Sequence, residues 1–144
     1  MVLDLLHVRV GQELPGRTVH VDRERLVAYA RASGDDNPIH QDEEFARSVG
    51  LPDVIAHGMW TMGAAIEVVN DWAGDPAAIV SYGTKFTKPV VVPADGGAEV
   101  EVSGVVKRVE EDTGRVTVDL TVTCAGVKVL GRAQAVVLAA VTAP

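Results

Sequence analysis

The segment from Ala56 to Asp71 constrains the fold of this chain more than any other. It carries apolar residues on almost every face of a helix, and Glu67 is its first formal charge. Such a helix is stable in water only when other elements cover it. The longest stretch without a formal charge, Val54 to Ile66, is shorter than the roughly 20 residues of a membrane span. We therefore expect a buried helix that other elements wrap.

The second half of the chain, from about Ala78, has the patterns of strands that would wrap this helix. Apolar and polar residues alternate strictly from Arg115 to Cys124, as in a strand with one buried face. Other strands are expected from Ile79 to Phe86, around Val100 and Val102 with a bulge-like slip at Gly104, and from Val127 to about Val141. Asp112 to Gly114 are expected to form a hairpin turn. Pro89 and Pro93 indicate edge or interrupted pairing between them.

The first half has the patterns of helices and loops, after a short strand from Arg17 to Val21. Asp22 is a good helix N-cap, and Gly34 ends that helix. A second, short helix is expected from Asp42 through Ser48. Segregated helices and strands predict one α+β domain over residues 1–144, with an antiparallel sheet curled around the buried helix. A four- or five-stranded sheet of this size leaves open edges, so we expect a dimer.

Composition excludes several classes of protein. The 144 residues carry a formal charge of −7, which disfavours general nucleic-acid binding. Cys124 is the single cysteine and is expected to be a buried structural thiol. The start of the chain has an acid at Asp4 and no cationic lead-in, unlike a secretory signal. We expect a soluble, cytoplasmic protein.

The turn-rich loop from Gly34 to His40 is the first candidate site. A carboxylate at Asp35 and an imidazole at His40, separated by the Asn37-Pro38 turn, would hold one water and move its protons near neutral pH. The alternative is that the acidic and amide residues are ordinary turn formers, with His40 incidental.

The second candidate is the entry to the buried helix, Ala56 to Met59. Free backbone N–H groups and the positive end of the helix dipole suit a developing oxyanion, and Gly58 lets a ligand approach the backbone. The alternative is a plain helix start, with His57 as a packing or capping residue. An acid–base pair beside oxyanion donors would suit α-proton chemistry on a carbonyl compound.

The stretch from Tyr29 to His40, with Ala46 six residues on, resembles the hydratase-2 signature of the MaoC-like (R)-specific enoyl hydratase and (3R)-hydroxyacyl-ACP dehydratase family. Residues 55–59 and 86–90 also resemble that family. The similarity spans nearly the whole chain. Within the family it comes nearest to the B subunits of actinobacterial (3R)-hydroxyacyl-ACP dehydratases.

The resemblance implies a single hot-dog fold and reversible hydration of trans-2-enoyl thioesters to (3R)-3-hydroxyacyl thioesters. It implies that Asp35 and His40 activate the catalytic water, that Asn37 supports the loop, and that the backbone N–H of Gly58 binds the thioester oxygen. It implies a thioester of CoA or acyl carrier protein as substrate, no metal or organic cofactor, and a homodimer or a heterodimer with a related hot-dog subunit. Neither nucleic acid nor membrane is an expected partner.

Two departures from the family pattern are present. Ala32 stands where the signature prefers Leu, Val, Ile or Gly, and Trp60 replaces the more usual Leu after His-Gly-Met. Trp60 either fills the core, which is the favoured interpretation, or narrows an acyl tunnel. Basic residues together with Tyr82 would contact a phosphopantetheine or CoA phosphate, although a solvated face explains any one of them as well: Lys85, Lys88, Lys107 and Arg108.

Two rival functions stay open. One is a subunit of a heteromeric dehydratase that mainly shapes the acyl channel of a partner; the presence of both Asp35 and His40 favours a catalytic role. The other is a hot-dog acyl thioesterase, which fold analogy alone suggests.

Overall fold

The computed structural model describes residues 3–140 of the chain. Its strands are β1 (Glu13–Val21), β2 (Ile79–Phe86), β3 (Ala98–Glu110), β4 (Arg115–Cys124), β5 (Val127–Lys128) and β6 (Leu130–Leu138). Its α-helices are α1 (Arg23–Ser33), α2 (Glu43–Ser48) and α3 (Gly58–Ala73). Short 3-10 helices are η1 (Leu5–His7), η2 (Pro38–His40) and η3 (Pro76–Ala78).

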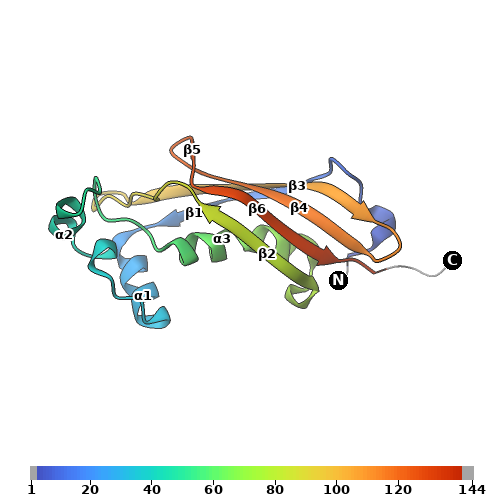
Figure 1. Cartoon of the computed structure of the whole chain (residues 1–144), viewed down its shortest axis with the longest axis horizontal. Coiled ribbons are helices and arrows are strands. Elements are labelled where there is room, and N and C mark those ends of the chain that lie inside the picture. Colours follow the sequence, from blue (N-terminus) through green and yellow to red (C-terminus); the bar gives the residue numbers. More distant parts are fainter. Residues whose placement is uncertain (1–2, 141–144) are drawn as a thin grey trace.

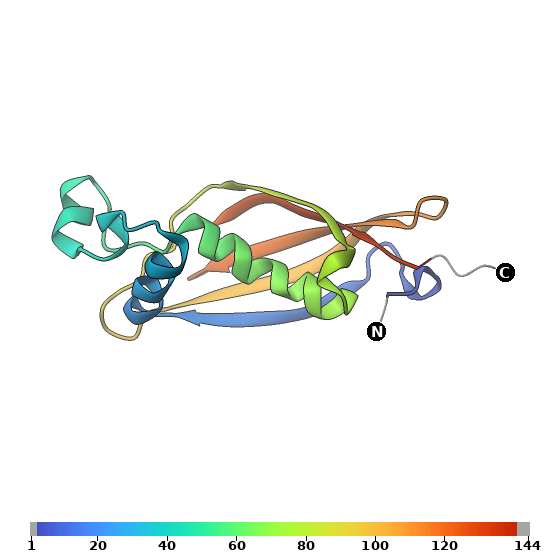
Figure 2. The ribbon, with the colours of Figure 1, turned by 90° about the horizontal axis from the view of Figure 1, so that it is seen from below.

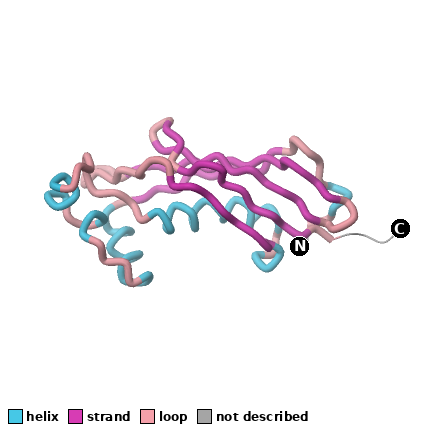
Figure 3. Tube along the Cα trace, in the orientation of Figure 1, coloured by secondary structure: helices cyan, strands magenta, loops and turns pink. Residues whose placement is uncertain are grey.

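One antiparallel sheet and one helix packed across it form the body of the molecule. The strand order is β1-β3-β4-β6-β2, and the short β5 pairs with β4. Helix α3 runs along one face of the sheet (Figure 2), and Figure 3 shows the strands as a layer with α3 beneath it. The predicted α+β class with an antiparallel sheet is confirmed. Strands β1 and β2 are the two edges of this sheet.

The buried face of α3 meets the inward valines of the sheet. Trp60, Val68 and Val69 belong to the same core cluster as Val118 and Val122 of β4. Trp60 thus packs in the core, as the favoured interpretation held. Each valine on a strand buries a stiff, branched side chain that packs well on a pleated surface.

The expectation that other elements cover α3 on all sides is wrong for the single chain. Met59 is 60% exposed, and Gly63 and Glu67 are exposed as well. A single curved sheet covers only one side of a cylinder, so the opposite side of α3 stays open. The helix also begins at Gly58 rather than Ala56. Among the described residues, no helix is both long enough and apolar enough to cross a membrane.

The strands differ from the sequence expectations in several details. β1 begins at Glu13, four residues before the expected start. At Gly104 the irregularity lies in the pairing with β1, whose register shifts between the pairs Leu14–Gly104 and Arg17–Val102. Within β3 itself, burial alternates through Gly104, and the β3–β4 register shifts between Val106 and Arg108.

The C-terminal part of the sheet also departs from one expectation. The strand expected from Val127 is divided into β5 and β6, and Val141 lies outside the described residues. The hairpin turn after Glu110 is confirmed: Gly114 has a φ of 76° and its N–H donates to the Glu110 carbonyl. Cys124 is only half-buried rather than buried, and burial together with nearby Glu99 raises the pKa of its thiol.

Helices α1 and α2 lie at one end of the molecule, beside the beginning of α3 and away from both termini (Figure 1). Asp22 accepts a hydrogen bond from the Arg25 N–H at 2.8 Å, and Asp42 accepts one from the Phe45 N–H at 3.1 Å. Both predicted N-caps are therefore confirmed. Gly34 ends α1 with a φ of 80°, a left-handed conformation that favours glycine.

Arg23 ties this end to the rest of the molecule. Its Nη2 lies 3.0 Å from Glu43 Oε1 and 2.9 Å from Asp53 Oδ1, and its Nε donates to the Val92 carbonyl at 2.6 Å. One half-buried guanidinium thus joins α1, α2, the segment before α3 and the segment that follows β2. The loop with the candidate residues is held between these elements.

Candidate active site

Side-chain-to-backbone hydrogen bonds order the loop after α1. Asp35 Oδ1 accepts from the Asn37 N–H at 3.2 Å, and Asn37 Oδ1 accepts from the Ile39 N–H at 3.1 Å. Pro38 then starts η2, whose last residue is His40. Short Asp and Asn side chains stabilise turns in this way. Asn37 therefore contributes to the shape of the loop, and this loop brings Asp35 and His40 together.

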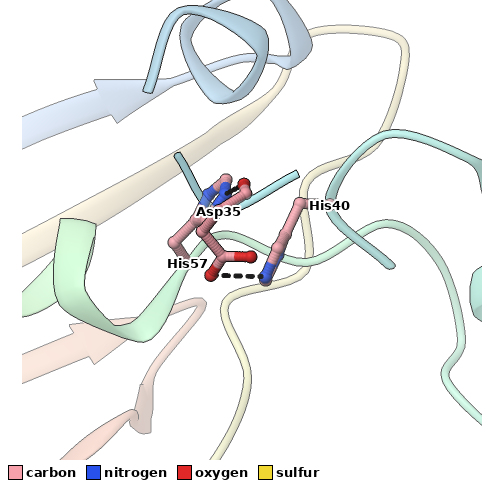
Figure 4. A group of neighbouring side chains, drawn as sticks. All are labelled: Asp35, His40 and His57. Carbon is pink, nitrogen blue, oxygen red and sulfur yellow. Dashed lines mark hydrogen bonds and ion pairs between the residues drawn. The ribbon is translucent and has the colours of Figure 1, made fainter. Parts of the chain in front are cut away.

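The carboxylate of Asp35 and the ring of His40 face each other. His40 Nε2 lies 4.0 Å from Asp35 Oδ2, the contact drawn as a dashed line in Figure 4. On its other side, His40 Nδ1 lies 2.7 Å from the Ile55 carbonyl oxygen. Because a carbonyl only accepts, Nδ1 carries the proton, and the neutral ring has a bare Nε2 directed toward Asp35.

The two groups have different surroundings. His40 is 7% exposed, whereas the side chain of Asp35 is 54% exposed. Burial lowers the pKa of His40 below 6.5; the nearby His57 also lowers it, and the Ile55 hydrogen bond and Asp35 partly oppose the change. At neutral pH the ring is therefore uncharged and able to accept a proton.

A cavity of about 420 Å³ opens beside this pair. Asp35 and His40 line it together with Gly58 at the start of α3, and most of the remaining wall is apolar, including Val90 and Leu130. A few polar groups in an apolar pocket are typical of a small-molecule site. The loop, the helix start and the β2 end thus meet at one cavity.

Gly58 is the first residue of α3, so its backbone N–H has no acceptor within the helix. A methyl group at this position would lie 2.9 Å from the Phe86 ring, which is closer than carbon atoms pack. The absence of a side chain therefore lets Phe86 cover the helix start. Phe86 is itself 55% exposed and lines the cavity.

His57 contacts both Asp35 and His40, which its neighbours in the sequence did not indicate. Its Nε2 lies 3.0 Å from the backbone carbonyl oxygen of Asp35, and its ring stacks on that of His40 with centroids 3.7 Å apart. The sequence interpretation offered only packing or capping, and its side chain makes no helix cap. No local pattern signals a contact between residues 22 positions apart.

Asp35, His40 and His57 each offer a ligand atom within 4.8 Å of the others. A metal needs lone pairs that converge on one point, yet one nitrogen of each ring already faces a backbone carbonyl. The stacked rings leave one imidazole nitrogen and one carboxylate facing each other. This arrangement suits proton transfer through a bridging hydroxyl better than metal binding. The expectation of no cofactor stays a prediction.

The other residues singled out in the sequence differ in whether they reach the cavity and in whether they already have a partner. Lys88 is exposed and lines the cavity. Lys107 lies 3.6 Å from Asp119, and Arg108 lies 3.4 Å from Glu110, both away from the cavity lining. Tyr82 stays neutral, because burial raises its pKa to about 12, but its hydroxyl donates to the Met62 carbonyl at 2.7 Å rather than to a ligand phosphate.

Comparison of the sequence with known proteins finds similar dehydratases. The chain is 41% identical to 3-hydroxyacyl-thioester dehydratase X of Mycobacterium tuberculosis over 86 residues. This match covers 60% of this chain and 30% of that protein. It is 34% identical over 79 residues to 3-hydroxybutyryl-CoA dehydratase of Methylorubrum extorquens, covering 54% and 50%. The matches thus span half or less of these relatives. The nearer resemblance to the B subunits stays a prediction.

Solved structures and a family profile agree with this result. A MaoC-like dehydratase superposes with a TM-score of 0.94 at 40% identity, over 96% of this chain and 43% of the other. A chain of the ChsH1-ChsH2 complex from Mycobacterium tuberculosis superposes with a TM-score of 0.78 at 25% identity, covering 91% and 98%. The expected hot-dog fold is confirmed. Because the profile described as "MaoC like domain" matches residues 7–124, the chain belongs to the MaoC-like domain family.

Proposed function

We propose that this protein catalyses the reversible hydration of trans-2-enoyl thioesters to (3R)-3-hydroxyacyl thioesters. The observation that carries the proposal is the bare Nε2 of His40 facing the Asp35 carboxylate at 4.0 Å, inside an apolar cavity at the start of α3. The names of the similar dehydratases support the same reaction class. Asp35 and His40 are the proposed catalytic residues.

The space between the two groups fits one water molecule. The acceptors, His40 Nε2 and Asp35 Oδ2, are 4.0 Å apart. For a water oxygen at a hydrogen-bond distance of about 2.8 Å from each, the angle between the two hydrogen bonds is about 90°. Water donates two protons at an angle not far from this value. Each acceptor therefore accepts a hydrogen bond from one O–H of the same water, and a lone pair of the water oxygen is left free to attack.

Hydration then proceeds with a balanced transfer of protons. The water oxygen forms a bond to C3 of the enoyl thioester while the Asp35–His40 pair takes one of its protons, and the π electrons move toward the thioester oxygen. A proton delivered to C2 on the same face completes the hydroxyacyl product and restores the pair. Dehydration is the reverse path.

The start of α3 stabilises the charge that develops on the thioester oxygen. The free N–H of Gly58 and the positive end of a 16-residue helix both favour an oxyanion there. One such donor is worth ~3 kcal/mol in other oxyanion holes. Asn37 has no direct part in this step; it holds the turn that places Asp35.

The cavity wall favours a fatty acyl thioester as the substrate class. Apolar residues such as Val90, Val129 and Leu130 line the space next to the catalytic pair. Lys88 offers a positive charge to a carrier phosphate, either of CoA or of an acyl carrier protein. The proposed reaction uses no metal or organic cofactor.

We also propose that the chain, as a single hot-dog unit, pairs with a second hot-dog subunit, identical or related. The edge strand β2 carries Val80, 44% exposed, and ends at Phe86 beside the cavity. One similar structure is a chain of the ChsH1-ChsH2 complex, which supports a related partner as well as an identical one. Mass measurement of the purified chain, alone and mixed with a candidate partner, tests this; a monomer under both conditions would contradict it.

The decisive experiment offers trans-2-enoyl-CoA thioesters of several lengths to the purified chain. Loss of absorbance of the conjugated double bond, with no free thiol released, is the expected result. Release of thiol with the double bond intact would instead identify a thioesterase. No change in either signal, in the presence of any related partner chain, would contradict the proposed activity.

A further inference from the structure

His57 is a buried imidazole between the proposed catalytic loop and helix α3. It is 2% exposed, and its Nε2 lies 3.0 Å from the Asp35 carbonyl oxygen. Because a carbonyl accepts only, Nε2 must carry a proton. Its Nδ1 is buried and has no hydrogen-bond partner within residues 3–140. A second proton on Nδ1 would therefore be a buried donor without an acceptor, which is costly.

The ring of His57 also lies flat against that of His40. The centroids are 3.7 Å apart and the planes meet at 22°, while Tyr29 of α1 approaches His57 with centroids 4.8 Å apart. Figure 4 shows both histidine rings beside Asp35. The stacked ring of His57 covers that of His40 and excludes water from it, and burial is the largest cause of the lowered pKa of His40.

We propose that His57 is the positioning residue of the site: its Nε2–H holds the backbone of Asp35, and its flat ring covers the stacked ring of His40 and keeps water away from it. The proposal rests on the proposed hydratase function for its kinetic consequence, but the contact between the two rings exists whatever the reaction is. Neither half of the role requires His57 to touch the substrate.

The groups that face the stacked rings are few. Asp35 lies on the loop after α1, and Tyr29 lies on α1 against His57. Among the described residues, the first turn of α3 contains no charged side chain, and Lys88 lines the same cavity. Asp35 and His57 are the nearby titratable side chains that change the pKa of His40, in opposite directions.

Two variants separate the two halves of this role. His57→Gln keeps an N–H donor able to reach the Asp35 carbonyl but removes the ring. His57→Phe keeps a flat ring on His40 but removes the donor. His20→Gln is the matched control, because His20 is an exposed imidazole paired with Glu99 away from the cavity.

The first measurement is a titration of His40 by NMR, which needs no activity. The pKa of His40 should lie below 6.5 in the unchanged protein and rise in His57→Gln, which uncovers the His40 ring; in His57→Phe, which keeps a flat ring over it, the rise should be smaller. The His20 variant should leave it unchanged. An unchanged His40 titration in His57→Gln would overturn the role of the stacked ring.

The second measurement is the enoyl-thioester hydration rate at pH 8, where His40 is uncharged in every variant. The kcat of His57→Phe should fall about 10-fold, the order of one lost hydrogen bond, with little change in KM. His57→Gln should keep most of its kcat at this pH. Equal rates for His57→Phe and the unchanged protein would overturn the role of the hydrogen bond.

The two readouts also keep this inference separate from the proposed function. If the unchanged protein shows no hydratase activity while the His40 titration shifts as expected, the function fails and the coupling of the two rings stands. If His57→Phe does not fold, His57→Asn replaces it, because the shorter amide does not reach the Asp35 carbonyl. Loss of kcat in His57→Asn, and not in His57→Gln, is then the expected result.

Discussion

The sheet core and the loop end of the molecule are held together in different ways. The sheet core, formed by β1–β6 and the buried face of α3, packs branched apolar side chains such as Val118 and Val122. The loop end, residues 22–57, depends on polar contacts: helix caps, turn side chains and the Arg23 network. Burial of apolar area is not directional, whereas hydrogen bonds set angles and distances. The proposed catalytic pair lies at the end where orientation is specified.

The largest expected effect is that of replacing His40, which tests whether a residue of the loop end affects activity without affecting stability. His40→Ala should lower the hydration rate by about 10²–10⁴-fold, the usual contribution of a general base. Its melting temperature should stay near that of the unchanged protein, because the residue packs at the edge of the core rather than inside it. Steady-state kinetics and thermal unfolding measure both effects, with His20→Ala as the control. A variant that keeps nearly full activity would contradict the assignment of the base.

Replacing Val122 in the sheet core tests the opposite case, in which stability falls. Val122→Ala should lower the free energy of unfolding by roughly 1–3 kcal/mol, because it leaves a void in a closely packed layer. Thr121→Ala, on the exposed face of the same strand, should change it by under about 0.5 kcal/mol. Denaturant unfolding measures both. Equal losses would show that the inward face of β4 is not the packed one.

Arg23 tests whether the loop end depends on polar contacts for its stability. Arg23→Ala should cost about 1–2 kcal/mol, since Asp53, with a side chain 17% exposed, loses its short contact with Arg23 Nη2. Arg31→Ala is the control on the same helix, where the side chain is exposed. Hydrogen exchange should rise in residues 22–57 and not in β4. A uniform rise over the whole chain would contradict the division.

The smallest effect concerns pH. Because burial lowers the pKa of His40 below 6.5, the ring is mostly uncharged at neutral pH, and it gains a proton as the pH falls through that lowered pKa. The kcat/KM for hydration should therefore be near its plateau at neutral pH and decline in acid with a midpoint below pH 6.5. A pH–rate profile measures this decline. A midpoint above 6.5 would contradict the burial of His40.

Much of the sheet core was predictable because its signals repeat locally. The alternation of Val116 to Cys124 predicted β4, and the hairpin turn before it follows from turn chemistry. The bounds of β2 agree with those predicted. The open face of α3 was not predictable, because an apolar sequence indicates burial without saying how far one sheet reaches around a helix.

The loop end was predictable in its residues but not in its contacts. Asp35, Asn37 and His40 lie within six positions, so turn chemistry alone predicts that they share a loop. The partners that define the site come from elsewhere: Ile55 fixes the tautomer of His40, and His57 holds the backbone of Asp35. These contacts join segments 15 and 22 residues apart.

The amino-acid sequence by itself determined the helix caps, the strand patterns and the position of the loop that carries Asp35 and His40. Each of these depends on residues two to five positions apart, whose geometry the backbone dictates. The tertiary structure alone decided which nitrogen of His40 is bare, which ring lies against it and that Phe86 covers Gly58. Those features depend on how distant segments pack, and a linear pattern does not encode a distance between them.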